Sequence, residues 1–133
     1  MINGRFGDTS GSPYVSAVVH PHFSEVWQPV SFLIDTGADT TILAPTDLAV
    51  IGMDFDEIRQ LPLHLIEGVG GLTATYEMEV ILSFRHEQER KAYMYDIKAL
   101  AVVDDGALES VASILGRDVI HRWMMNYNYP ARS

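Results

Sequence analysis

The chain has no cysteine among its 133 residues. This absence excludes a disulfide-stabilised scaffold and any thiol chemistry, and it is compatible with a cytosolic location. Long hydrophobic runs are absent too, because no apolar stretch approaches the roughly eighteen residues that a membrane-spanning helix needs. The first residues, Met1 to Arg5, lack the apolar core of a secretion signal. We therefore expect a cytoplasmic protein without a membrane segment.

Basic side chains are scarce. Nine Lys and Arg residues stand against 18 Asp and Glu residues, which gives a formal net charge of −9. Such a field repels the phosphates of nucleic acids and anionic membrane surfaces. We therefore expect neither nucleic acid nor a membrane as a partner. The acidity would favour basic peptide segments as substrates, although solubility alone is the simpler explanation.

Residue patterns for metal binding are missing as well. The five histidines show none of the spacings with carboxylates that are typical of a zinc site. Asp54 and Asp56 lack the Gly and Glu that complete a calcium loop. We expect no metal and no cofactor, and we interpret residues 20–22 (His-Pro-His) as a solvated turn. Trp27 and Trp123 are interpreted as core or interface residues rather than as a ligand cage.

The overall composition is typical of a soluble globular protein. Hydrophobic residues make up 47% of it and charged residues 20%. A chain of this length forms one domain and buries about two thirds of its unfolded surface. We predict a single domain over residues 1–133, with residues 1–13 as a flexible arm.

Short apolar segments separated by turn residues predict a mostly β protein. In the clearest segment, apolar residues from Tyr76 to Phe84 alternate with Glu77, Glu79 and Ser83. The predicted strands cover residues 14–20, 26–34, 40–43, 61–66, 72–84, 92–103 and 124–129.

Two short helices are predicted between the strands. Thr46 and Asp47 supply N-cap chemistry for the first, and Gly52 ends it. The second covers residues 117–122, and a further short segment opens at Asp54. Many short strands with one or two short helices indicate an all-β fold shaped like a small barrel.

An acidic residue at the end of an apolar strand is the most informative feature. Residues 32–41 read Phe-Leu-Ile-Asp-Thr-Gly-Ala-Asp-Thr-Thr, so that the apolar run delivers Asp35 into a tight turn. A carboxylate in this position is costly unless hydrogen bonds hold it or chemistry uses it. Gly37 removes the Cβ where the backbone bends sharply or approaches another group. The alternative is an ordinary turn at the end of a strand, in which Asp and Gly have only their usual structural roles.

Two further segments accompany this loop. Residues 113–118 read Ser-Ile-Leu-Gly-Arg-Asp, and residues 67–72 read Glu-Gly-Val-Gly-Gly-Leu. In order and placement, the three segments resemble the retropepsin-like (retroviral-type) aspartic protease family over about residues 30–122. The loop at 32–41 resembles the catalytic loop, the segment at 113–118 the support beneath it, and the segment at 67–72 the flap tip. For the last segment, a plain Gly-rich hairpin is the alternative.

The resemblance implies a small closed β-barrel of the retropepsin-like acid protease type, acting as a homodimer. Because this loop occurs once in the chain, the second carboxylate must come from a second copy. The two Asp35 carboxyls would share one proton and activate a water that hydrolyses a peptide bond, a behaviour established for aspartic proteases in general. The expected activity is that of an aspartic endopeptidase on a peptide or protein substrate, with an acidic to mildly acidic pH optimum.

The resemblance also implies roles for individual residues. The catalytic residues would be Asp35, Thr36 and Gly37, with Thr36 hydrogen-bonding across the dimer axis. The substrate-binding residues would be Ala38, Asp39, Gly68, Val69, Gly70 and Gly71. The supporting residues would be Ile114, Leu115, Gly116 and Arg117. We also predict an ion pair between Asp39 and Arg117, whose disruption would cost about 3–5 kcal/mol if the pair is buried.

The chain departs from the family pattern in two places. The separation from Asp35 to Gly116 is longer than in compact retroviral enzymes, with the extra material in residues 43–66, and residues 123–129 differ from theirs. The dimer interface is therefore left open. A catalytically silent retropepsin-fold module that binds peptides or dimerises is the alternative function. An unrelated β-domain with a chance turn is the third.

Overall fold

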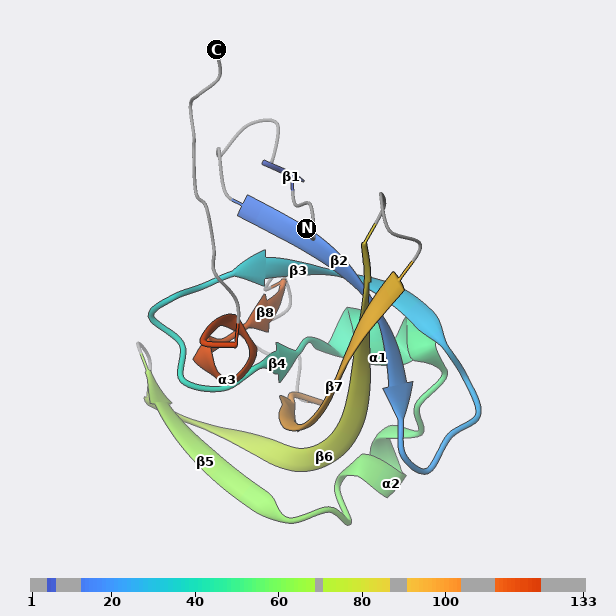
Figure 1. The fold of residues 1–133 in the computed structure, drawn as a ribbon. Helices are drawn as coiled ribbons and strands as arrows, with labels where there is room; N and C mark the ends of the chain where they lie inside the picture. Colours follow the sequence, from blue (N-terminus) through green and yellow to red (C-terminus); the bar gives the residue numbers. More distant parts are fainter. Residues whose placement is uncertain (1–4, 7–12, 69–70, 87–90, 104–111, 123–133) are drawn as a thin grey trace.

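The computed structural model describes residues 5–6, 13–68, 71–86, 91–103 and 112–122 (Figure 1). The predictions for residues 1–4 and 7–12 of the arm, for the strand at 124–129 and for Trp123 lie outside these residues. The described strands are β1 (Arg5–Phe6), β2 (Pro13–Pro21), β3 (Gln28–Ile34), β4 (Ile42–Leu43), β5 (Leu63–Gly68), β6 (Gly71–His86), β7 (Lys91–Ala101) and β8 (Ser113–Leu115). The described helices are α1 (Pro45–Ile51), α2 (Phe55–Ile58) and α3 (Arg117–Ile120).

The described strands form a closed barrel, which confirms the predicted fold class. Six of them follow one another in the order β2, β3, β8, β4, β7 and β6. The ring closes because β2 also pairs with β6, with Val18 opposite Ser83 and Pro21 opposite Val80. Strands β1 and β5 extend the sheet outside this ring. None of the helices in the described part of the chain is long and apolar enough to cross a membrane.

Side chains from alternate strand positions fill the barrel. On β6, Met78, Val80, Leu82 and Phe84 are all fully buried, as their alternation with polar residues predicts. On the neighbouring β2, Val15, Ala17 and Val19 are buried in the same way, while Ser16 between them is exposed. The period of two in these strands therefore sets which face of the sheet becomes the core.

Strand β8 brings two distant parts of the sequence together. It lies parallel to β3, with Phe32 opposite Ser113 and Ile34 opposite Leu115. On its other side, Ile114 pairs with Ile42 of β4. The chain leaving β3 at Asp35 therefore loops around the end of β8 before it returns as β4 (Figure 1).

Helix α1 begins earlier than its sequence suggests, and the predicted N-cap is wrong. The N-cap is Ala44, whose side chain makes no cap hydrogen bond, and Pro45 follows at the first helical position. Proline suits that position because its φ is already helical and it has no N–H to satisfy. Asp47 instead accepts a hydrogen bond from the buried Ser113 hydroxyl at 2.5 Å. Gly52 ends the helix with φ +86°, as predicted.

The predicted turn at residues 20–22 is also partly wrong. Strand β2 continues through Pro21, which is buried, and the turn begins at His22. Trp27 is 46% exposed and stacks on the His20 ring with 4.0 Å between centroids. Its exposure shows that it is not a core residue.

The two faces of α1 provide a test of this core. Leu48 is fully buried and Val50 is 65% exposed on the same helix. We expect Leu48→Ala to lower the free energy of unfolding by about 2–5 kcal/mol, because it leaves a cavity. Val50→Ala is the control and should change it by less than about 0.5 kcal/mol. Equal effects of the two substitutions in urea denaturation would contradict the described packing of α1.

Candidate active site

The backbone around Asp35 forms a tight, hydrogen-bonded turn. The Asp35 N–H donates to the carbonyl of Leu115 at 3.1 Å, and the Ala38 N–H donates to the Asp35 carbonyl at 3.2 Å. The Gly37 N–H donates to Asp35 Oδ1 at 2.9 Å. One carboxylate oxygen is thus held by the turn, while the side chain stays partly accessible. This turn alone is the ordinary Asp-Gly arrangement, so the surroundings of the loop decide what it can do.

The loop after β3 is docked along its length on the segment that follows β8. The Arg117 N–H donates to the Ala38 carbonyl at 2.8 Å. Gly116 lies against the backbone of Thr40, because a Cβ at residue 116 would be 2.6 Å from the Thr40 carbonyl carbon. Only glycine allows this approach. The predicted supporting segment therefore does contact the Asp35 loop.

The far end of the loop is fixed by residues that the sequence reasoning did not identify. Thr41 is fully buried, and its N–H and hydroxyl both donate to the Asp118 carboxylate, at 3.0 and 2.8 Å. The Thr41 hydroxyl also accepts a hydrogen bond from the Gly116 N–H at 3.2 Å. The only signal in the sequence was that Asp118 follows Arg117 in the resembling segment.

The predicted ion pair between Asp39 and Arg117 is present. Arg117 is 41% exposed and Asp39 is 81% exposed at their side chains. The pair lies at the surface, so the larger cost expected for a buried pair does not apply to it. Solvent screens such a pair and reduces its contribution to stability.

The remaining predicted residues lie on the neighbouring strands and turns. Thr36 and Gly37 are exposed, Ile114 pairs with Leu33, and Leu115 is fully buried. Gly68 and Gly71 face each other across the β5–β6 hairpin, and Gly71 has φ +112°. Val69 and Gly70 lie outside the described residues. In the view of Figure 1, the end of β5, the start of β6 and the loop after β3 lie at the same edge of the molecule.

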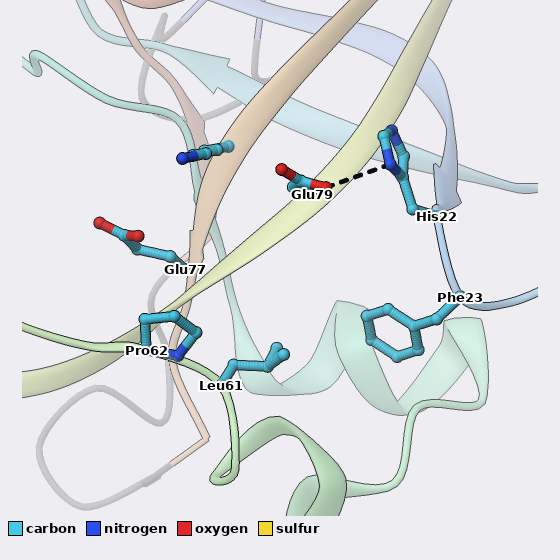
Figure 2. A pocket seen from close by; sticks show the side chains of 7 residues that line it. His22, Phe23, Leu61, Pro62, Glu77 and Glu79 are labelled. Atoms are coloured by element: carbon cyan, nitrogen blue, oxygen red, sulfur yellow. Dashed lines mark ion pairs between the residues drawn. The ribbon is translucent and has the colours of Figure 1, made fainter.

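A surface pocket occurs at a different place from the Asp35 loop (Figure 2). Phe23, Leu61 and Pro62 provide its apolar walls, and Glu77 and Glu79 lie on β6 beside it. The pocket is also lined by His22 and Lys98. It contains none of the residues predicted for catalysis.

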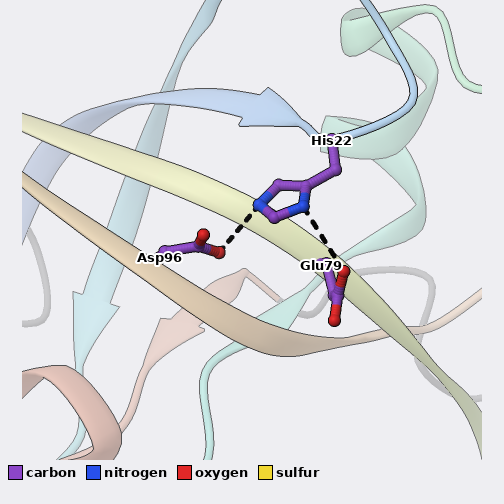
Figure 3. Close-up of polar contacts among 3 residues, drawn as sticks. All are labelled: His22, Glu79 and Asp96. Carbon is purple, nitrogen blue, oxygen red and sulfur yellow. Dashed lines mark hydrogen bonds and ion pairs between the residues drawn. The ribbon is translucent and has the colours of Figure 1, made fainter.

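His22 lies between two carboxylates at the edge of that pocket (Figure 3). Its Nε2 is 2.7 Å from Asp96 Oδ1, and its Nδ1 is 3.3 Å from Glu79 Oε2. These contacts link the turn after β2 to β6 and β7. They do not make a metal centre, because the described ranges hold no group of three or more His, Cys, Asp or Glu side chains arranged to bind an ion.

Known structures share this barrel. The chain resembles a retropepsin-like aspartic protease from Rickettsia conorii with a TM-score of 0.61 and 16% identity, over 94% of this chain and 92% of that one. It also resembles the EIAV protease complexed with the inhibitor HBY-793, with a TM-score of 0.53 and 16% identity, over 92% of this chain and 100% of that one. At this level of identity the likeness concerns the fold. No curated protein matches the chain.

The fold and the docked loop define a retropepsin-like protein. The family described as retroviral aspartyl protease matches residues 11–127, which is most of the sequence. The chain belongs to this family. The resemblance drawn from residues 30–122 is thereby confirmed, as is the fold that it implied.

The close approach of Gly116 to Thr40 leads to a stability prediction. Gly116→Ala should lower the free energy of unfolding by about 2–4 kcal/mol, because the methyl group overlaps backbone that cannot rotate away. Gly52→Ala is the control, since a Cβ there meets nothing within 4 Å and only its positive φ is strained. That strain costs about 1 kcal/mol. A smaller loss at residue 116 than at residue 52 in urea denaturation would contradict the docking.

The exposure of the Asp39–Arg117 pair leads to a second prediction. A double-mutant cycle with Asp39→Asn and Arg117→Gln should give a coupling energy below about 1 kcal/mol, as for other exposed pairs. The coupling should fall further as salt is added, because ions screen exposed charges. A coupling of about 3 kcal/mol that is insensitive to salt would instead indicate a buried pair.

Proposed function

We propose that the chain is an aspartic endopeptidase that acts as a homodimer. The observation that supports this most is the docked turn at Asp35, found in a chain of the retroviral aspartyl protease family. The turn leaves the Asp35 carboxylate partly accessible at the end of β3, with Thr36 and Gly37 exposed beside it. The loop is rigidly supported and open on one side.

The dimer follows from the number of such loops. One chain supplies one carboxylate of this kind, and acid–base hydrolysis without a metal needs two. A second copy of the chain, related by a twofold axis, supplies the other. Exposed Thr36 is the residue proposed to hydrogen-bond to its counterpart across the axis, and Gly37 permits the close approach of the two loops.

The two Asp35 carboxyls would work as a pair with one proton. Like charges about 3 Å apart cannot both ionise easily, so one carboxyl stays protonated, as in aspartic proteases generally. The ionised carboxylate takes a proton from a water whose oxygen attacks the scissile carbonyl carbon. The protonated carboxyl donates to the carbonyl oxygen. When the C–N bond breaks, a proton passes to the leaving amine, and no covalent enzyme intermediate forms.

The substrate would be an extended peptide segment. It would lie between the Asp35 pair and the β5–β6 hairpins, with Gly68 to Gly71 as the flap tips and the backbone near Ala38 and Asp39 as hydrogen-bonding partners. Extended peptides bind in this way by adding strand-like hydrogen bonds to existing strands. The open flank of β5, which pairs only with β6 among the described strands, suits a hairpin that moves.

The proposal predicts a specific loss of activity. Wild-type protein should sediment as a dimer and cleave a denatured protein at about pH 5. Asp35→Asn should still dimerise and fold but lose at least about 10³-fold in kcat, because an amide cannot serve as the base. Asp47→Asn, on α1, is the matched control with the same change in charge.

Two outcomes would contradict the proposal in different ways. Equal cleavage by the wild type and Asp35→Asn would show that another group, or a contaminant, does the chemistry. A folded dimer that binds peptides but cleaves none would support the silent module instead. In that case the peptide affinity of the wild type and Asp35→Asn should be similar.

A further inference from the structure

Asp118 makes a two-point side-chain contact to the loop that carries Asp35, yet the proposed reaction does not use it. Both of its carboxylate oxygens are occupied by one residue: Oδ2 accepts the Thr41 N–H at 3.0 Å and Oδ1 accepts the Thr41 hydroxyl at 2.8 Å. Hydrogen bonds to an ionised carboxylate are stronger than neutral ones. Thr41 is fully buried, so its donors have no water as an alternative partner.

The position of Thr41 makes this contact relevant to Asp35. The loop is attached to the segment after β8 at its start, through the Asp35 N–H and the Leu115 carbonyl, and in its middle, through Ala38 and the Arg117 N–H. At the far end, the Thr41 carbonyl accepts the Leu100 N–H of β7 at 2.9 Å, and the Asp118 carboxylate holds the Thr41 N–H and hydroxyl. Without Asp118, the loop would keep its other attachments but lose both hydrogen bonds that these buried donors make to the carboxylate.

The contact also stabilises the other groups at that end of the loop. The Thr41 hydroxyl donates to Asp118 and at the same time accepts from the Gly116 N–H at 3.2 Å. This fixes the hydroxyl proton on the Asp118 side. Gly116 in turn lies against the Thr40 backbone. One carboxylate therefore accepts from both donors of a buried residue that lies beside the close approach of Gly116 to Thr40.

We propose that Asp118 is a positioning residue that holds the Asp35 carboxylate in its reactive place by fixing Thr41. The proposal rests on the proposed function, since Asp118 touches neither substrate nor water in the reaction. Its effect is on the geometry of the loop, and a displacement of about 1 Å at a reacting group can cost about 10²-fold in rate.

A second tether in the same region provides a matched control. Ser113 donates to Asp47 at 2.5 Å and accepts from the Ala44 N–H at 2.9 Å, so it ties β8 to the start of α1. This contact also joins a carboxylate to a buried hydroxyl, but it does not touch the Asp35 loop. We therefore expect Asp47→Ala to remove a comparable interaction without moving Asp35.

The test compares Asp118→Ala, Asp118→Asn and Asp47→Ala as folded dimers. Asp118→Ala should lower kcat about 10²-fold with KM changed less than about 3-fold. Asp118→Asn should recover most of kcat, because its carbonyl oxygen still accepts the Thr41 N–H. Asp47→Ala should lower the melting temperature as much as Asp118→Ala does but keep kcat within about 3-fold of wild type.

Amide hydrogen exchange gives a readout that does not require activity. The Gly37 N–H reports directly on the Asp35 carboxylate, to which it donates. Exchange at Gly37 and Thr41 should be faster in Asp118→Ala and unchanged at Gly37 in Asp47→Ala. If the wild type cleaves nothing, the proposed function fails, and the exchange at Gly37 still decides whether Asp118 positions Asp35.

Two results would overturn the positioning role. One is an Asp118→Ala dimer with wild-type kcat and unchanged Gly37 exchange. The other is an equal loss of kcat in Asp47→Ala, which would mean that any destabilisation of this region has the same effect.

Discussion

The structure depends on one backbone contact, the docking of the Asp35 loop on the segment after β8. Hydrogen bonds from Asp35 to Leu115 and from Arg117 to Ala38 attach it, and the missing Cβ of Gly116 allows the two backbones to touch. The parallel pairing of β8 with β3 makes this possible, because it brings a segment about eighty residues away to the end of the strand that carries Asp35. The barrel strands β3 and β8 thus position the Asp35 loop and the segment after β8.

The charged side chains around the loop differ in how buried their contacts are, and this difference separates their roles. The exposed pair of Asp39 and Arg117 lies where water screens it, and it contributes little to stability. Asp118 faces buried donors on Thr41, where water cannot replace it. The partly accessible Asp35 is held by one turn hydrogen bond at Oδ1, which leaves its other oxygen for the proposed chemistry. A loop that is supported on one side and open on the other suits the proposed reaction, in which a second copy of the chain supplies the other carboxyl group.

Much of the fold could be predicted from sequence, because the strands of the barrel bury every second residue. The alternation from Tyr76 to Phe84 therefore gave both the strand and its buried face. The start of α1 could not be predicted, since the capping residues Thr46 and Asp47 look suitable and the deciding partner, Ser113, is distant in sequence. Trp27 is not in the core, because hydrophobicity does not show whether a turn residue is buried, and its assignment to an interface stays a prediction.

In the candidate site, too, the residue that was missed is one whose partner is distant in sequence. Asp35 and Gly116 stand out because their residue types are unusual in apolar surroundings, whereas Asp118 at the start of a short helix looks like an ordinary acidic residue in a first turn. Its importance comes from pairing with Thr41 across the fold, which sequence spacing does not reveal.

The most direct test of the central claim is the distance between the two Asp35 carboxyl groups in a crystal structure of the dimer. The account predicts that their nearest oxygens lie about 3 Å apart, close enough to share one proton. A dimer whose Asp35 carboxyls lie more than about 6 Å apart would contradict it, because two carboxylates at that distance no longer share a proton.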